Sequence, residues 1–132
     1  MNTNLSPVYI LMSRVFLALI FVLSGLAKLS AIDATKGHME AMHVPGFLVF
    51  PTVIFEVGGG LLIMLGYRTR IIALLFAVFS LVTAFIFHNQ FADPAQMNNF
   101  LKNISISGGF LLLASVGAGS LSLDARKVSS LT

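Results

Sequence analysis

The sequence contains no cysteine, which excludes disulfide bonds, thiolate metal sites and thiol-based electron transfer within the chain. Charge is also scarce, because only 10% of the 132 residues are charged, whereas 57% are hydrophobic. A water-soluble domain of this length needs more polar surface than this composition supplies. We therefore expect a single domain that is surrounded by lipid.

The sequence also lacks the motifs of nucleic-acid binding and of common soluble enzymes. Its net charge is +3, but the eight Lys and Arg residues are scattered and form no basic stripe. There is no phosphate-binding loop, Ser–His–Asp arrangement or zinc-ligand spacing, and "EVGGG" lacks the glycine spacing of a dinucleotide-binding loop. These absences argue against a nucleic-acid partner and a nucleotide cofactor.

Four apolar runs predict four membrane-spanning helices, at residues 8–27, 47–66, 71–87 and 100–118. Each run is close to the roughly 20 residues that cross a bilayer. The first run lacks the basic start and small-residue cleavage site of a signal peptide, so we expect it to remain as a helix. The predicted fold is all-α, a four-helix transmembrane bundle.

The loop charges predict the orientation of this bundle. Four spans place both termini on one side, together with the short loop "YRTR". That side collects most of the basic loop residues, namely Arg68, Arg70, Arg126 and Lys127. Because positive residues favour the cytoplasmic side, both termini are predicted to be cytoplasmic.

Several short motifs follow one another in a recognisable order. "SGLAK" ends the first span, "MEAMHVPGF" lies in the first loop and "EVGGGLLIMLGYRTR" runs through the second span. "FHNQF" follows the third span, and "FLKNISISGGFLLLA" forms most of the fourth. In this order the chain, from about residue 14 to 126, resembles the DoxX family, particularly its YphA/YqjF-like small inner-membrane members. One departure is His43, where the family pattern has a glycine.

The resemblance implies a four-helix bundle in the bacterial cytoplasmic (inner) membrane. Some relatives are membrane subunits of oxidoreductase systems, including quinone-linked thiosulfate oxidation and a superoxide-defence assembly. The resemblance therefore implies a quinone as a candidate ligand and a redox protein as a candidate partner. The sequence leaves open whether the chain forms a homo-oligomer.

Two charges lie deep within the predicted spans. A charge at the centre of a spanning helix costs about 2.5–3.5 kcal/mol on insertion scales, so it usually faces the bundle and has a partner. Counting from the predicted span ends separates Glu56 and Arg14 by only about 7 Å along the membrane normal. The sequence therefore predicts a buried Arg14–Glu56 ion pair.

Small and polar residues mark one face of each predicted helix. In the first span, Arg14, Phe21 and Lys28 recur every seven residues. In the second, Gly59 and Gly60 follow Glu56 and would let another helix approach closely. The corresponding stripes in the other spans are Ala77, Ser80, Ala84 and His88 in the third, and Asn98, Lys102, Ser105 and Gly109 in the fourth.

Glu56 and His88 are candidates for a ligand-binding or proton-relay site. Histidine titrates near neutral pH, and a desolvated carboxyl group can exchange protons in the same range. The alternative is that Glu56 belongs to a structural polar core and that His88 is an ordinary interfacial residue. Lys102 and Asn103 open the predicted fourth helix, where a cation opposes the helix dipole, so they suggest an anionic ligand or lipid headgroups.

The first predicted loop contains "HMEAMH", with His38, Met39, Met42 and His43 at helical spacing. Imidazole and thioether ligands suit copper(I), so these residues are copper candidates. The alternative is an amphipathic interfacial helix whose methionines pack on lipid or on the bundle.

The leading functional hypothesis is a membrane subunit of a quinone-linked redox system, with a lipophilic ligand bound near Glu56. A structural anchor that assembles partner proteins is one alternative. A proton-coupled carrier of a small hydrophobic molecule is another.

Overall fold

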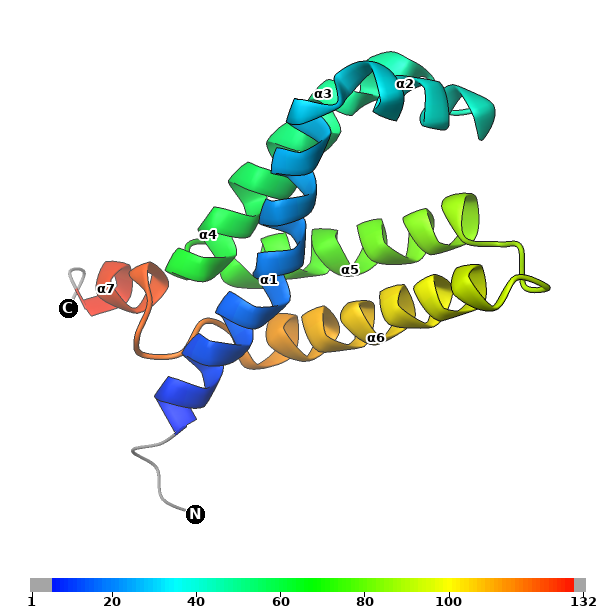
Figure 1. Ribbon diagram of the computed structural model, residues 1–132. Coiled ribbons are helices and arrows are strands. Elements are labelled where there is room, and N and C mark those ends of the chain that lie inside the picture. The colour runs from blue at the N-terminus through cyan, green and yellow to red at the C-terminus, as the bar shows by residue number, and fades with distance from the viewer. Residues whose placement is uncertain (1–5, 130–132) are drawn as a thin grey trace.

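The computed structural model describes residues 6–129, which are almost entirely helical (Figure 1). Within this part of the chain there is no strand. The elements are α1 (Ser6–Ser30), α2 (Ile32–Ala41), the 3-10 turn η1 (Gly46–Leu48), α3 (Val49–Ile54), the π-helical turn η2 (Phe55–Gly59), α4 (Gly60–Leu65), α5 (Thr69–Phe87), α6 (Pro94–Val116) and α7 (Leu123–Ser129).

Four of these helical stretches are long and apolar enough to cross a membrane, as the sequence predicted. They are α1, the continuous run from η1 to α4 (Gly46–Leu65), α5 and α6. Two boundaries differ from the prediction by more than two residues, because α1 continues to Ser30 and α6 begins at Pro94. The earlier start of α6 follows from Asp93, whose side chain accepts a hydrogen bond from the backbone N–H of Ala95 and caps the helix.

The four spans form two helical hairpins. In the first, α1 packs against the run from η1 to α4, and in the second, α5 packs against α6. The start of α1, the turn between α4 and α5, and α7 lie at one end, which we call the α7 end (Figure 1). The two hairpins diverge toward the opposite end, which we call the α2 end.

Phenylalanine rings from all four spans fill the centre of the bundle. The ring of Phe76 in α5 lies 4.6 Å from Phe21, 4.4 Å from Phe55 and 5.1 Å from Phe110, measured between centroids. These separations are close to those of packed aromatic pairs, which bury large apolar areas. The aromatic cluster therefore joins the two hairpins below the point where they diverge.

The predicted stripe on the third span is confirmed for its first three members, because Ala77, Ser80 and Ala84 are all buried. The stripe predicted for the fourth span is wrong for three of its four members; the fourth, Gly109, is half-buried, and a Cβ atom added there would lie 2.8 Å from Cδ2 of Leu17 in α1. In α6 the buried residues are Ser107, Phe110 and Leu113, while Asn98, Lys102 and Ser105 are exposed. The polar residues of α6 lie mostly in its first half, so their spacing did not report which face of the helix packs against α5.

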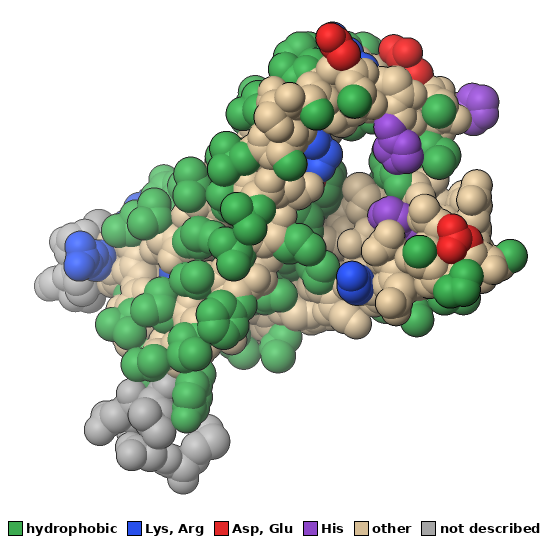
Figure 2. Space-filling model, in the orientation of Figure 1, with side chains coloured by type: hydrophobic (Ala, Val, Ile, Leu, Met, Phe, Trp, Pro, Cys, Tyr) green, Lys and Arg blue, Asp and Glu red, His purple; other side chains and the backbone are tan. Residues whose placement is uncertain are grey.

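The face of the molecule seen in Figure 2 carries many hydrophobic side chains, above all over α1. Large hydrophobic side chains of the spans are well exposed, for example Ile54 at 72%, Phe16 at 66% and Leu112 at 65%. Soluble monomers rarely expose apolar patches of this extent. Lipid contact explains them.

Candidate functional site

A cavity of about 440 Å³ lies between the two hairpins on the side of the α2 end. Figure 2 shows the molecule hollowed there, between α2 and the end of the α5–α6 hairpin. We call it the inter-hairpin cavity. Its apolar lining includes Ile20, Phe21, Phe79, Val82, Ile86, Phe87 and Ile106, and its polar lining consists of Ser24, Lys28, Thr35, His38, Thr52, Glu56, Thr83, His88 and Asn103. The volume falls within the range of small-molecule sites.

An ion pair lies in the wall of this cavity. The Nζ atom of Lys28 is 2.9 Å from Oε2 and 3.1 Å from Oε1 of Glu56, and it also donates to Oγ of Ser24 at 2.8 Å. The Glu56 side chain is only 4% exposed, whereas that of Lys28 is 24% exposed. The carboxylate is thus held inside the bundle, with its charge balanced by the lysine.

The predicted ion pair between Arg14 and Glu56 is therefore wrong. The physical reason is the length of α1: the prediction ended it at residue 27 and left Lys28 in a loop, but the helix continues to Ser30. Lys28 is consequently still part of α1 and faces Glu56. Arg14 lies two heptads earlier, about 21 Å away along the helix.

Arg14 has a different role at the α7 end. It is fully buried, and its guanidinium group donates to the carbonyl oxygens of Ile63 at 3.3 Å and Met64 at 2.9 Å, and to that of Leu121. The carbonyls at 63 and 64 belong to the last turn of α4, where a cation is favourable. Arg14 therefore ties α1, α4 and the segment before α7 together.

Local backbone features bring Glu56 against α1. Glu56 lies in the π-helical turn η2, a distortion often found at functional sites. A Cβ atom added at Gly25 of α1 would lie 2.6 Å from Cγ2 of Val57, and one added at Gly60 would lie 2.7 Å from Cγ2 of Val22. The prediction that small residues beside Glu56 allow a close helix approach is confirmed for Gly60, and also for Gly59, where an added Cβ atom would lie 3.1 Å from Cε2 of Phe76 in α5.

The structure brings three of the four ligand-binding or proton-relay candidates to the same cavity: Glu56, His88 and Asn103. Two of the copper candidates, His38 and Met39, also line it. His88 ends α5, and its Nδ1 atom is 2.8 Å from Oε1 of Gln96 in α6. The Nδ2 atom of Asn103 donates to Oγ1 of Thr83 at 3.4 Å. Polar groups therefore line the cavity on both hairpins.

Lys102 does not join this group. Its side chain is exposed, and Lys102 is not among the residues that line the cavity. The prediction that Lys102 and Asn103 open the fourth helix is also wrong, because α6 begins at Pro94, more than two turns earlier. At that distance from the helix start the dipole exerts little effect on the lysine, so this reason for expecting an anionic ligand no longer holds.

The four copper candidates have different surroundings. The His38 ring stacks on Phe87 with 5.4 Å between centroids, and Met39 is buried in an apolar cluster with Val49 and Val53. His43 is exposed and follows α2 with a φ of 62°, while Met42 is half-buried. Within residues 6–129, no three His, Asp or Glu side chains are grouped in a way that could hold a metal ion. The copper site stays a prediction.

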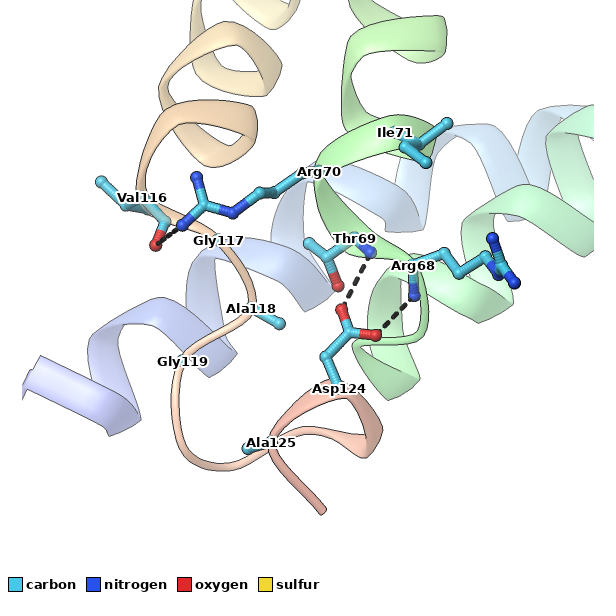
Figure 3. Close-up of a pocket in the computed structure, with 10 residues that line it drawn as sticks. All are labelled: Arg68, Thr69, Arg70, Ile71, Val116, Gly117, Ala118, Gly119, Asp124 and Ala125. Carbon is cyan, nitrogen blue, oxygen red and sulfur yellow. Dashed lines mark hydrogen bonds between the residues drawn. The ribbon is translucent and has the colours of Figure 1, made fainter. Parts of the chain in front are cut away.

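A second cavity, of about 450 Å³, lies at the α7 end (Figure 3). The Asp124 carboxylate accepts from the backbone N–H groups of Arg68 at 2.7 Å and Thr69 at 3.0 Å, so it caps the start of α5. Arg70 donates to the last carbonyls of α6, those of Ala114, Ser115 and Val116. These side chains complete helix ends, which favours a structural role for this region.

The same contacts affect the ionisation of Asp124. Burial opposes ionisation, but the N–H donors of Thr69 and Arg68, together with the Thr69 side chain and the charge of Arg14, outweigh it and hold the pKa of the Asp124 carboxyl group below its ordinary value. The capping interaction is therefore made by the charged form.

Sequence reasoning missed five polar residues of the cavity lining as members of the site: Ser24, Lys28, Thr35, Thr52 and Thr83. A signal for Lys28 was present, because it shares the heptad stripe with Phe21, which also lines the cavity. Thr83 gave no such signal, because its position depends on how α5 packs against α6. The cavity therefore contains the buried carboxylate of Glu56, the ammonium group of Lys28, the imidazole of His88 and the amide of Asn103, beside apolar walls.

Comparisons with known proteins agree with this architecture. The model of the DoxX family matches residues 9–89. Inner membrane protein YqjF of Escherichia coli (strain K12) is 44% identical over 121 residues, covering 92% of this chain and 93% of the relative. Inner membrane protein YphA of the same strain is 39% identical over 127 residues, covering 91% of each.

A more distant relative is CatD of Bacillus subtilis (strain 168), whose name provisionally describes an oxidoreductase. It is 31% identical over 117 residues, which cover 86% of this chain and 83% of the relative. No solved structure shows a significant match to the chain. The family match over more than half of the chain, the inner-membrane relatives and the four spanning helices lead to one conclusion. The chain belongs to the DoxX family and is a multi-pass protein of the bacterial inner membrane.

Proposed function

We propose that this protein is a membrane subunit of a redox system and that it binds a lipophilic ligand such as a quinone in the inter-hairpin cavity. The observation that carries the proposal is the Lys28–Glu56 ion pair in the wall of a cavity that is otherwise largely apolar. A charged pair inside a membrane bundle is costly, so it favours a functional site.

The residues of the cavity fit such a ligand. The ring of a quinone needs apolar walls, which Phe79, Val82 and Ile86 provide. Its oxygen atoms need hydrogen-bond partners, and the ammonium group of Lys28 can donate while the Glu56 carboxylate can accept. The cavity lies between spanning helices, so a membrane-dissolved molecule has a short route to it.

A bound quinone would supply the redox chemistry, because the reduction of a quinone to a quinol takes up two electrons and two protons. In this proposal Glu56 and His88 hold and release the protons. The electrons come from a partner redox protein, to which the membrane subunit presents the ligand. The provisional oxidoreductase name of the relative CatD is in keeping with a redox role.

The first test is mass spectrometry of the organic extract from detergent-purified protein. We expect a quinone in near-stoichiometric amount in the wild type and its loss in Glu56→Gln. Glu40→Gln is the matched control, because Glu40 is an exposed acid of α2 outside the cavity lining. It should retain the ligand.

A variant that leaves the ion pair intact separates loss of the ligand from loss of the fold. Ile86→Phe narrows the apolar part of the cavity and should also release the ligand, while circular dichroism shows that the helices persist. If the wild type yields bulk lipid alone, the quinone site is refuted, and a structural anchor for partner proteins becomes the better hypothesis. Proton-dependent uptake of a hydrophobic molecule into vesicles, lost in Glu56→Gln, would instead favour a carrier.

A further inference from the structure

We infer that the cavity binds its ligand through hydrogen bonds at two opposite edges of the ligand. Lys28 and Glu56 form the first polar anchor, and Thr83 and Asn103 form a second polar anchor on the other side of the cavity. This inference rests on the proposed function and specifies the class of ligand. The ligand is a flat, lipophilic molecule that carries a hydrogen-bonding oxygen atom on each of two opposite edges.

The two anchors belong to different hairpins. Lys28 and Glu56 lie on α1 and η2, in the first hairpin, whereas Thr83 and Asn103 lie on α5 and α6, in the second. All four residues line the same cavity. The hairpins diverge at this end of the molecule (Figure 1), so a ligand that contacts both anchors spans the gap between them.

The second anchor has unused hydrogen-bonding capacity. Oγ1 of Thr83 donates to the carbonyl oxygen of Ser80 at 3.1 Å and accepts the long 3.4 Å bond from Nδ2 of Asn103. That bond is the one that the structure records for the Asn103 amide, which leaves an N–H hydrogen and a carbonyl oxygen available. The side chain of Asn103 is half-buried and lines the cavity, so these free groups are accessible to a ligand.

Both anchors can donate and accept hydrogen bonds. At the first, Lys28 donates and Glu56 accepts, and at the second, the amide of Asn103 does both. Each anchor can therefore hydrogen-bond to a ring oxygen in either form, as a carbonyl, which accepts a hydrogen bond, or as a hydroxyl, which donates one. Between the anchors, Phe79 and Ile106 supply apolar surface for the body of the ring.

The test compares two isomers as probes, 1,4-naphthoquinone and 1,2-naphthoquinone. They have the same atoms, but the oxygens lie on opposite edges in the first and side by side in the second. Binding is measured by equilibrium dialysis of the full chain in detergent, with saturable binding separated from partition into empty micelles. The chain has no cysteine, so there is no thiol for either quinone to alkylate.

We expect the wild type to bind the 1,4 isomer roughly three- to tenfold more tightly than the 1,2 isomer, the worth of about one hydrogen bond. Asn103→Leu should abolish this preference and leave the affinity for the 1,2 isomer nearly unchanged. Asn98→Leu is the matched control, because Asn98 is an exposed residue of α6 outside the cavity lining, and it should keep the preference. Thr83→Val tests the same anchor without a change in shape and should weaken the preference.

The outcomes separate the two proposals. Equal affinity of the wild type for both isomers, or a preference that survives Asn103→Leu, refutes the second anchor and leaves the proposed function standing. Absence of saturable binding of either isomer to wild-type protein whose organic extract contains no quinone refutes both.

Discussion

The ion pair between Lys28 and Glu56 joins α1 to η2 through hydrogen bonds to both carboxylate oxygens. Removing one partner of a buried ion pair costs more than removing both, because the remaining charge stays desolvated and unpaired. The 4% exposure of the Glu56 side chain makes this asymmetry relevant here.

Lys28→Met tests that asymmetry. We expect it to lower the free energy of unfolding by about 3 kcal/mol, because it leaves the carboxylate unpaired in the bundle. Adding Glu56→Gln in the same chain should recover part of the loss. Thermal melting in detergent, followed by circular dichroism, measures the stability of the single and the double variant. Tryptophan fluorescence is not an option because the chain has no tryptophan. Strictly additive effects of the two substitutions would contradict a direct pair.

At the scale of the elements, the close approach of α1 to η2 depends on Gly25. An alanine Cβ there would lie 2.6 Å from Cγ2 of Val57 and 3.2 Å from Cβ of Glu56, so one of the helices has to move. We expect Gly25→Ala to destabilise the protein by about 1–3 kcal/mol through overpacking, and to weaken ligand retention by displacing Glu56.

Gly108→Ala is the control for that substitution. An added Cβ at Gly108 meets nothing within 4 Å, and alanine favours helix, so this variant should be neutral or slightly more stable in thermal melting. If both variants melt at the same temperature as the wild type, the helices have room at Gly25 and the packing argument fails.

The cap that Asp124 provides to α5 makes stability depend on pH. The pKa of this carboxyl group is lowered in the folded protein, so the unfolded chain takes up the proton first as the pH falls. The stabilisation is therefore fully present above the unfolded pKa, near 4, and is lost as the pH drops through the lower folded value.

Asp124→Asn isolates this contribution. In melting experiments between pH 3 and 7, we expect the wild type to lose more stability than the variant as the pH falls. At pH 7 the variant should melt lower, because an amide is a weaker acceptor for the N–H groups of Arg68 and Thr69. Parallel melting curves for the two proteins across this range would show that the cap does not titrate.

For the whole molecule, the orientation in the membrane decides from which side the cavity is reached. Because Arg68, Arg70, Arg126 and Lys127 lie at the α7 end, we propose that this end faces the cytoplasm and that the cavity lies toward the outer side. Single cysteines in this cysteine-free chain can test that orientation.

A cysteine at Ala92, in the α5–α6 loop, should react with a membrane-impermeant maleimide added to intact cells. One at Tyr67, in the α4–α5 turn, should react only after the cells are opened. The reverse pattern would invert the topology, and labelling of both in intact cells would rule out a single orientation.

The sequence by itself determined the number of spans, the lipid surroundings and the position of an acid, Glu56, inside a spanning helix. These follow from local hydropathy, since a run of about 20 apolar residues needs no knowledge of its neighbours to be identified. The stripe that contains Arg14, Phe21 and Lys28 was visible for the same reason, because a heptad spacing is a property of one helix.

The tertiary structure alone decided which base pairs with Glu56, which face of α6 is buried and that a cavity exists. Each depends on quantities that hydropathy does not contain. An extension of α1 to Ser30 gives Glu56 the lysine as its partner, and the packing of α6 on α5 places Asn103 beside Thr83. The cavity arises where the two hairpins diverge (Figure 1). This divergence depends on the angles at which the helices pack, which the sequence of a single helix does not specify.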